Sequence, residues 1–358
     1  MVSTGVQVAR ALRKQIFSSH LGTVLRNGRY NYPLFIKYRS FSSASAEIAN
    51  ERDPAPLFFN EDVQKLLQTL TRVDLKKVYR QRKEGQRMEP PEYKFMTDDE
   101  LKSALEEAKA KAVIKLQMPP VVKLEDISPS IMSVDHELQG YDESKFVFTD
   151  ITYGVQSTKR IMVVRDTDGI LREADPKERH RLNQIYFPLE GREIDTPKLF
   201  DQDYLKDLLS REEYEFILDL ACVQFEPNAA EYHEITKSVY DYVNSMKHFE
   251  HLRSTRHFGP LAFHLAWSKN IDNLLLENIE TSRLDDAVLL VQLYYIVNPT
   301  SSSADVKFQG DVLKFIQCYL DTESNMKQKL ELAIQSYIDL EHAKREVDKG
   351  IKEAQGLD

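Results

Sequence analysis

One stretch with strand periodicity, residues 146–171, constrains the fold of this chain more than any other feature. Its first part, 146–153, alternates with a period of two and is rich in aromatic and β-branched residues, as strands are. A second apolar run follows at 161–165, and Asp168-Gly169 then provides a dipeptide typical of a two-residue hairpin turn before a return strand. Charged helical patterns surround this stretch. The sequence therefore predicts a mostly α-helical chain with a small antiparallel β-hairpin or sheet in the middle.

The same stretch has a second interpretation as an active site. The apolar run leads into Asp166-Thr167-Asp168-Gly169, which resembles the opening of Mg²⁺-dependent, haloacid-dehalogenase-type phosphatases. There Asp166 would attack the phosphoryl group and Asp168 would protonate the leaving group. The alternative is a hairpin tip with two solvated turn carboxylates. A phosphatase also needs repeated strand–helix alternation, and the downstream sequence is almost entirely helical, so we favour the hairpin.

The first 41 residues have the composition of a mitochondrial transit peptide. They contain seven basic residues and no Asp or Glu, together with serines and a helical apolar face. Arg39-Ser40-Phe41-Ser42 resembles a matrix-peptidase site, so cleavage is expected at Phe41 and Ser42, followed by a linker over 42–56. A retained basic arm that binds nucleic acid is the alternative. No apolar run is long enough for a membrane span, so we expect a matrix protein without a membrane partner.

The charge balance restricts what the mature protein can bind. The whole chain has 48 Lys and Arg against 57 Asp and Glu, a net charge of −9. Removing the seven basic residues of 1–41 leaves a net charge of about −16. Such a body repels phosphate at long range, so any nucleic-acid contact requires a local basic patch.

Two segments are candidates for that patch. The first is a basic run with one tyrosine that could stack on a base, and it could hold RNA through phosphates. Its candidate contact residues are Arg72, Lys76, Lys77, Tyr79, Arg80, Arg82, Lys83 and Arg87. The second segment places Arg253 and Arg256 around two hydroxyls before a helix, where they could grip a phosphate. The alternatives are a solvated charged face for the first and arginines bound to acidic neighbours for the second.

Helical periodicity and breakers divide the remaining chain. We expect a helical and extended segment over 57–140, a small β region with one helix over 141–198, and a C-terminal helical domain over 199–358. Asn60 is a plausible N-cap of a helix at 58–70, Thr97 opens one that reaches about 117, and 121–141 is irregular. Ser210 and Glu213 form a capping-box pattern. Helices are expected near 202–209, 211–224, 229–249, 257–269, 271–279, 283–297, 306–321 and 323–349, paired in an α-solenoid-like arm.

No other motif indicates catalysis or a cofactor. The sequence has no glycine-rich phosphate loop, nucleophile elbow or cysteine–histidine pair, and only 12 glycines. His248, His251 and His257 lie close in sequence, but no carboxylate or cysteine stands at a usual ligand spacing beside them. We therefore expect no catalytic residue, cofactor, metal or small-molecule substrate.

Short blocks of this sequence resemble a known family. They occur in the family's order over about residues 57 to 297, and together they are similar to the animal mitochondrial small-subunit ribosomal protein number twenty-two family. The blocks are Glu92-Tyr93-Lys94-Phe95-Met96-Thr97, Met118-Pro119-Pro120-Val121, Phe146-Val147-Phe148-Thr149-Asp150-Ile151, Val163-Val164-Arg165, Tyr186-Phe187-Pro188, Gln224-Phe225-Glu226-Pro227, Leu252-Arg253-Ser254-Thr255-Arg256 and Val291-Gln292-Leu293-Tyr294.

The resemblance implies a structural, non-catalytic component of the small subunit of the mitochondrial ribosome. Its partners would be other small-subunit proteins and, locally, the small-subunit ribosomal RNA. This agrees with the transit peptide and explains an acidic body, because such proteins bind mainly other proteins. A matrix helical adaptor outside the ribosome is the second interpretation, and the phosphatase is the third.

Overall fold

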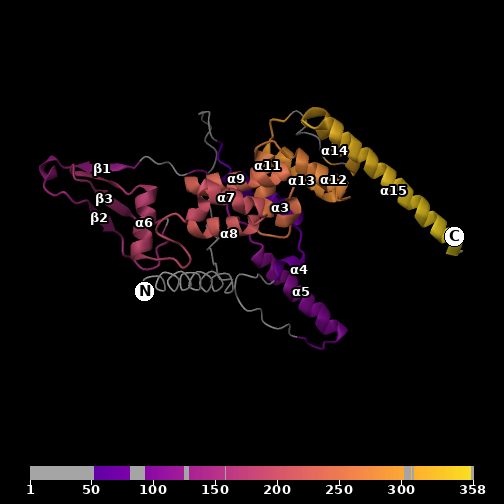
Figure 1. The fold of residues 1–358 in the computed structure, drawn as a ribbon, viewed down its shortest axis with the longest axis horizontal. Helices are drawn as coiled ribbons and strands as arrows, with labels where there is room; N and C mark the ends of the chain where they lie inside the picture. The colour runs from indigo at the N-terminus through magenta and orange to yellow at the C-terminus, as the bar shows by residue number, and fades with distance from the viewer. Residues whose placement is uncertain are drawn as a thin grey trace, which may run out of the picture.

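The computed structural model describes residues 52–80, 93–124, 129–157, 159–301, 308 and 310–355. A β-sheet module lies at one end, short helices form the body, and a long helix extends from the other end (Figure 1). The predicted fold class, mostly helical with a small antiparallel sheet in the middle, is confirmed. The presequence, its cleavage residues Phe41 and Ser42, and Arg82, Lys83 and Arg87 lie outside the described residues.

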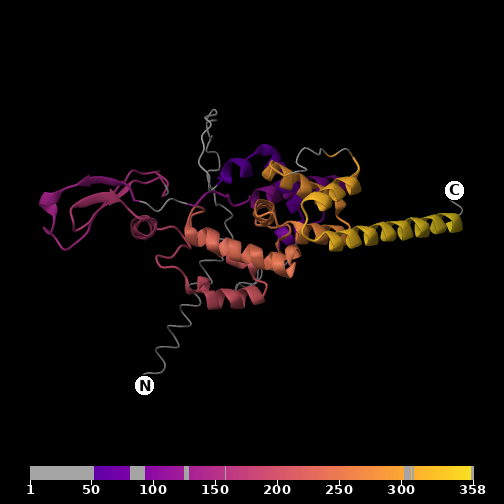
Figure 2. The ribbon, with the colours of Figure 1, turned by 90° about the horizontal axis from the view of Figure 1, so that it is seen from above.

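The sheet module contains four antiparallel strands in the order β1-β4-β3-β2. The strands are β1 (Ile131–Val134), β2 (Phe146–Thr149), β3 (Met162–Arg165) and β4 (Ile170–Glu173). Helix α6 (Pro176–Tyr186) covers one face, where a small core of buried Met162, Val164 and Ala174 packs against Leu182 (Figures 1 and 2).

Strand β1 corrects the prediction of an irregular segment over 121–141. Its four residues are all exposed and form an edge of the sheet, so their sequence shows no alternation between apolar and polar positions. Pairing with β4, from a distant part of the chain, makes this segment a strand. Local periodicity could not predict that pairing.

The hairpin between β3 and β4 has a wider turn than the two-residue turn predicted from Asp168-Gly169. The Gly169 amide donates to the Asp166 carbonyl at 3.0 Å, and the Asp166 amide donates to the Ile170 carbonyl at 2.9 Å. A two-residue turn of the Asn-Gly type needs positive φ at both central residues, but only Gly169, at 78°, has it in this turn. The two-residue prediction is therefore wrong, although the hairpin itself is present.

The first predicted helix, α3 (Glu61–Thr71), packs into the helical body. The Asn60 side chain caps it by accepting a hydrogen bond from the Asp62 amide at 2.9 Å. Buried Leu67 and Leu70 lie in the same hydrophobic core as the C-terminal helices, and α3 contacts α11 (Phe258–Trp267) and α13 (Leu284–Val297). The N-terminal part of the chain therefore completes the core of the C-terminal helices (Figure 1).

The helical body is built from contacting pairs, namely α8 with α9, α11 with α13, α12 with α13, and α13 with α14. The predicted helices are present with shifted ends. The capping box at Ser210 and Glu213 is wrong, because the Ser210 hydroxyl donates back to the Asp207 carbonyl at 2.7 Å. The helices are α2 (Ala55–Phe58), α4 (Leu75–Val78), α5 (Asp98–Lys115), α7 (Gln202–Ser210), α8 (Tyr214–Gln224), α9 (Ala230–Met246), α10 (Phe249–Leu252), α12 (Asp272–Glu280), α14 (Val312–Thr322) and α15 (Lys327–Gln355), with short 3₁₀ turns at His136–Leu138 and Lys198–Phe200.

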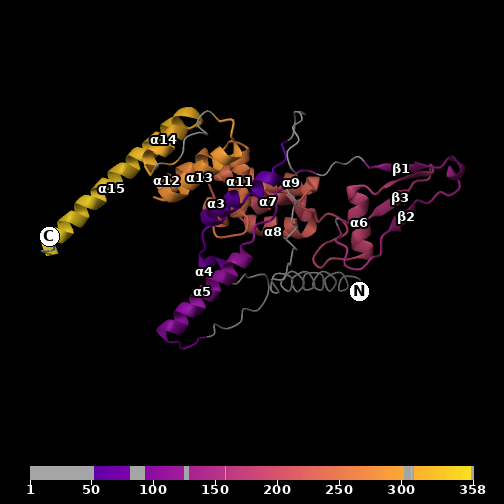
Figure 3. The same ribbon diagram turned by 180° about the vertical axis from the view of Figure 1, so that it is seen from behind.

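Two helices extend from the body (Figure 3). Helix α5 begins with the expected capping box of Thr97 and Glu100, and Ala112 is its one buried residue. Helix α15 packs near its start through buried Leu330 and Ile334 and then continues away from the body. Among the described residues, no helix has the length and apolar character needed to cross a membrane.

Candidate nucleic-acid interface

Arg72, the first residue of the predicted basic patch, binds a buried carboxylate of the protein, although 46% of its own side chain is exposed. It caps the C-terminus of α3 with a positive φ of 55°. Its Nε lies 2.8 Å from Asp286 Oδ2, and its Nη2 donates to Asp286 Oδ1 at 3.0 Å. This two-pronged contact is the geometry in which guanidinium binds carboxylate most strongly. Asp286 therefore occupies the hydrogen-bonding edge of the Arg72 guanidinium that a phosphate would need.

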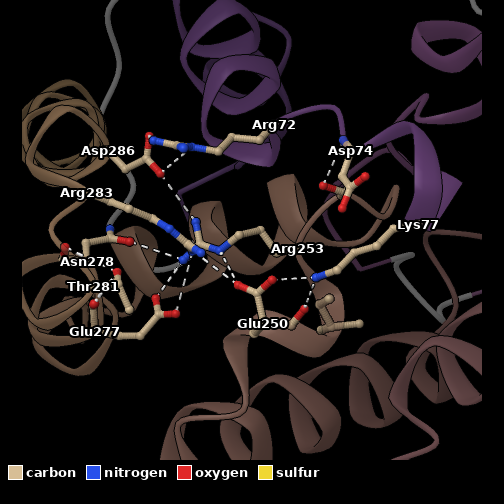
Figure 4. A network of polar contacts seen from close by, with 12 residues as sticks. Arg72, Asp74, Lys77, Glu250, Arg253, Glu277, Asn278, Thr281, Arg283 and Asp286 are labelled. Atoms are coloured by element: carbon tan, nitrogen blue, oxygen red, sulfur yellow. Dashed lines mark hydrogen bonds and ion pairs between the residues drawn. The ribbon is translucent and has the colours of Figure 1, made fainter. Parts of the chain in front are cut away.

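Arg253, from the second candidate segment, is buried, with 3% of its side chain exposed. Its Nη2 lies 2.6 Å from Glu277 Oε2 and 3.1 Å from Asn278 Oδ1, and its Nη1 lies 3.4 Å from Asp286 Oδ2 (Figure 4). Burial raises the pKa of the Glu277 carboxyl, and the positive charge of Arg253 opposes that rise. The guanidinium compensates carboxylates that are expensive to bury alone.

The two candidate segments meet although they are far apart in the sequence. Arg72 and Arg253 share Asp286, and the Ser254 amide donates to the Thr71 carbonyl at 3.0 Å. Figure 4 shows these arginines pointing from two sides toward the carboxylates of the helical body. Their role in the structure is to join the end of α3 to that body.

Arg256 has a separate acidic partner. Its guanidinium lies 2.6 Å from Asp219 Oδ1, and His257 Nε2 lies 2.9 Å from the same oxygen. Of the two interpretations of 253–256, the structure has the one in which the arginines bind acidic neighbours. Asp219 comes from α8, so this contact also connects elements of the body.

The rest of the first segment is more exposed. Lys77 Nζ donates to the Glu250 carboxylate and, at 3.1 Å, to the Glu250 carbonyl. Arg80 lies 3.8 Å from Glu215 with 70% of its side chain exposed. Lys76 is exposed, and its ammonium forms no ion pair with a residue that the structure describes. Lys76 and Arg80 are therefore the described cations of this segment that the chain's own carboxylates engage least.

Tyr79, proposed to stack on a base, already has partners within the protein, although 38% of the residue is exposed. Its hydroxyl donates to the Ala108 carbonyl at 2.8 Å, and the Lys115 ammonium lies 4.3 Å from the ring centroid. The ring therefore attaches the start of the basic segment to α5. Sequence reasoning did not predict this contact, because nothing local indicates that α4 and α5 meet.

Sequence reasoning also missed the acidic side of the network, Glu250, Glu277 and Asp286. The pair Asp285-Asp286 was visible at the start of a helix, where acidic residues are common anyway. An arginine run shows that cations are present but not which distant carboxylates they will contact. The tertiary contacts of α3 are what bring them together.

The phosphatase interpretation fails on the fold. The strand before Asp166 belongs to an antiparallel hairpin, whereas the phosphatase fold needs alternating parallel strands and helices. Asp166 lies 2.7 Å from Arg172 Nε and 2.9 Å from Lys145 Nζ, and Asp168 is exposed. Burial works to raise the pKa of Asp166, but hydrogen bonds from Arg172 and Lys145 hold it below the usual value. Asp166 is a structural carboxylate.

The clustered histidines have protein partners. The Tyr214 hydroxyl lies 2.7 Å from His248 Nδ1, and His251 Nε2 lies 3.3 Å from Glu212 Oε2. In the part of the chain that the structure describes, no three His, Cys, Asp or Glu side chains are grouped so that they could hold a metal ion.

Comparison with known proteins adds the family. Residues 56–299 match the family model described as mitochondrial 28S ribosomal protein S22. The chain is 37% identical over 301 residues to small ribosomal subunit protein mS22 of Mus musculus, covering 84% of this chain and 83% of the mouse protein. It is 36% identical over 296 residues to the Bos taurus protein of the same name, covering 82% of each. The resemblance found in the sequence is thus confirmed, and the chain belongs to the mitochondrial 28S ribosomal protein S22 family.

Proposed function

We propose that this chain is a structural component of the small subunit of the mitochondrial ribosome and supports mitochondrial translation from the matrix. The family match over 56–299 carries this proposal, because it spans the sheet module and most of the helical body. The composition of the first 41 residues, typical of a transit peptide, supports the same location.

Its contacts within the ribosome are mainly with other proteins. Arg72, Arg253 and Arg256 bind carboxylates of the chain itself, so three of the candidate cations neutralise internal acid. The sequence carries a net charge of −9 even with its basic first 41 residues, and an acidic surface binds basic neighbours more readily than phosphate.

Contact with ribosomal RNA is local and involves the segment after α3. Lys76 and Arg80 are its accessible described cations, and Arg82, Lys83 and Arg87 continue the run in the sequence. Ultraviolet crosslinking of intact small subunits should place RNA adducts within the 76–87 peptide. Adducts concentrated at 253–257 would contradict this assignment, because Arg253 is buried.

A matrix helical adaptor outside the ribosome remains the competing function. Gradient sedimentation of mitochondrial lysate containing the tagged full chain separates the two. A ribosomal component comigrates with the small-subunit ribosomal RNA and moves to lighter fractions when ribonuclease digests that RNA. An adaptor stays in the light fractions with or without ribonuclease.

A further inference from the structure

Strand β2 exposes large apolar side chains on the face of the sheet that α6 does not cover. Register pairs Val147 with buried Val164 on the α6 face, so Phe146 and Phe148 point to the opposite face. They are 47% and 56% exposed. The buried core of the module consists of three apolar residues on the α6 side of the sheet. The opposite face, with Phe146 and Phe148, therefore has no covering layer from the described chain.

The outer edge of β2 also has unpaired backbone groups. The Asp150 amide donates to the Ile161 carbonyl at 3.0 Å, and the same register pairs Phe148 with Val163 and Phe146 with Arg165. Hydrogen-bonding residues alternate along an antiparallel pair, so the N–H and C=O groups of Val147 and Thr149 point away from β3. None of the described strands lies on that side.

The two edges of the sheet differ in how well they could receive another strand. Edge strand β1 has a register irregularity between Ile131 and Ser133, a feature that protects edges against pairing. Strand β2 keeps an unbroken register with β3 over all four residues. A regular, unprotected edge beside exposed aromatics is the arrangement that binds an extended segment by strand addition.

The charges at the ends of β2 identify the class of partner. Asp142 and Glu143 precede the strand and Asp150 follows it. Asp142 and Glu143 form no salt bridge with a described residue, and nearby Lys145 is held by Asp166. The Asp150 carboxylate accepts hydrogen bonds from Thr152 and is attracted by the nearby Arg160. Two carboxylates without a described cationic partner before the strand, and a third after it, disfavour an RNA strand stacked on Phe146 and Phe148, and they favour lysine and arginine.

We propose that the free edge of β2 pairs with an extended, basic segment of a neighbouring protein, which becomes a fifth strand beside β2. This rests on the proposed function, because it takes the neighbour to be another protein of the small subunit. Apolar side chains of the added strand pack beside Phe146 and Phe148, and its basic residues face Asp142, Glu143 and Asp150.

The test uses the full chain incorporated into small subunits, with a photoreactive benzoylphenylalanine in place of Phe146. Val147→Pro removes one outward amide and leaves the β2–β3 bonds in place, since proline is tolerated at the open side of an edge strand. Val147→Ala is the matched control, because it shortens the side chain and keeps the amide. We expect the protein crosslink to fall about tenfold in Val147→Pro relative to Val147→Ala, as for one lost hydrogen bond.

A second variant tests the charge argument without touching the sheet. Glu143→Lys should also weaken the protein crosslink, and the crosslinked peptide should be rich in lysine or arginine. Equal crosslinks in Val147→Pro and Val147→Ala, or an RNA adduct at position 146, would overturn the proposal. If either of these results is obtained while the variant chain still sediments with the small subunit, only the strand-addition proposal fails. If the unsubstituted chain does not sediment with the small subunit, the proposed function itself is refuted.

Discussion

At the scale of single residues, arginines that bind the chain's own carboxylates explain how an acidic protein can carry runs of positive charge. Arg72 and Arg253 come from segments that read as basic patches, yet both bind Asp286 inside the molecule. A charge run in a sequence shows which groups are present, and burial decides whether solvent or a partner can reach them. Here Arg253, which lies in the best local motif for binding phosphate, is buried, and Arg72 is held by Asp286 although 46% of its side chain is exposed.

Arg253→Met should destabilise the protein strongly. The substitution keeps an apolar side chain of similar length but removes the positive charge that Glu277 and Asp286 face. Breaking a buried ion pair by removing one partner costs roughly 3–5 kcal/mol of stability. Denaturant unfolding of the full chain measures this loss. Lys76→Met, at an exposed cation, is the control and should leave the midpoint unchanged. A midpoint for Arg253→Met equal to that of the control would show that the network contributes nothing to stability.

Asp166 should make the sheet module sensitive to acid. Its folded-state pKa is lowered despite burial, by hydrogen bonds from Arg172 and Lys145. The stability it contributes is therefore present above the ordinary carboxyl pKa of about 4 and is lost as the pH falls through the lower folded value. Hydrogen exchange of 145–178, corrected for intrinsic rates, should show protection lost on acidification.

The Asp166→Asn variant provides the comparison for that acid response. It should lose about 1.5–3 kcal/mol at neutral pH, as for a charged hydrogen bond, and should respond less to acid than the original chain. Asp168→Asn, at an exposed carboxylate, should behave like the original chain. An identical acid response in Asp166→Asn would mean that other carboxylates control the module.

At the scale of elements, periodicity and capping predicted where helices and hairpin strands lie, because both depend on near neighbours. Asn60 and Thr97 perform the capping roles that their spacing indicates. Strand β1 and the partners of α3 could not be predicted in this way. Each is determined by contact with a distant segment, and a four-residue exposed strand carries almost no pattern of its own.

Gly169 is the residue on which the β3–β4 hairpin depends most. A Cβ there would lie 2.1 Å from the Asp135 carbonyl oxygen, and the backbone φ of 78° already disfavours other residues. Gly169→Ala should therefore cost more than the roughly 1–2 kcal/mol of the backbone conformation alone. Gly154→Ala is the matched control, with φ of 82° and no atom within 4 Å of its Cβ.

Limited proteolysis of both full-length glycine variants distinguishes these two costs. Gly169→Ala should be cut within 131–173 faster than Gly154→Ala. Equal rates would show that the Asp135 backbone moves aside without loss of stability and that its contact with the turn is unimportant.

Helix α3 should be required for the stability of the C-terminal helices. Leu67 is fully buried against the body, so Leu67→Ala should cost about 2–5 kcal/mol as a large-to-small core substitution. The control is Leu105→Ala on α5, where the side chain is 44% exposed and little packing is lost. Thermal unfolding followed through Trp267, which lies in α11, reports on this core. A melting temperature equal to that of Leu105→Ala would show that α3 does not contribute to the stability of the helical body.

At the scale of the whole molecule, a helical body carries a sheet module at one end and a long helix at the other (Figure 1). The helical arm was predictable from the sequence, as was the acidic balance. The candidate RNA site was predictable only in part, because Lys76 and Arg80 are accessible while Arg72, Arg253 and Tyr79 have partners inside the protein. Sequence showed the cations, and the fold determined which of them remain exposed.

The copy number of this chain in purified small subunits tests the central claim most directly. A structural component is present in every particle, so absolute quantification by mass spectrometry should find the chain equimolar with the small-subunit ribosomal RNA. Its amount should not fall after repeated gradient purification at moderate salt. A chain that is substoichiometric to the RNA and declines with each purification step would contradict a structural role and identify a transient ribosome-associated adaptor.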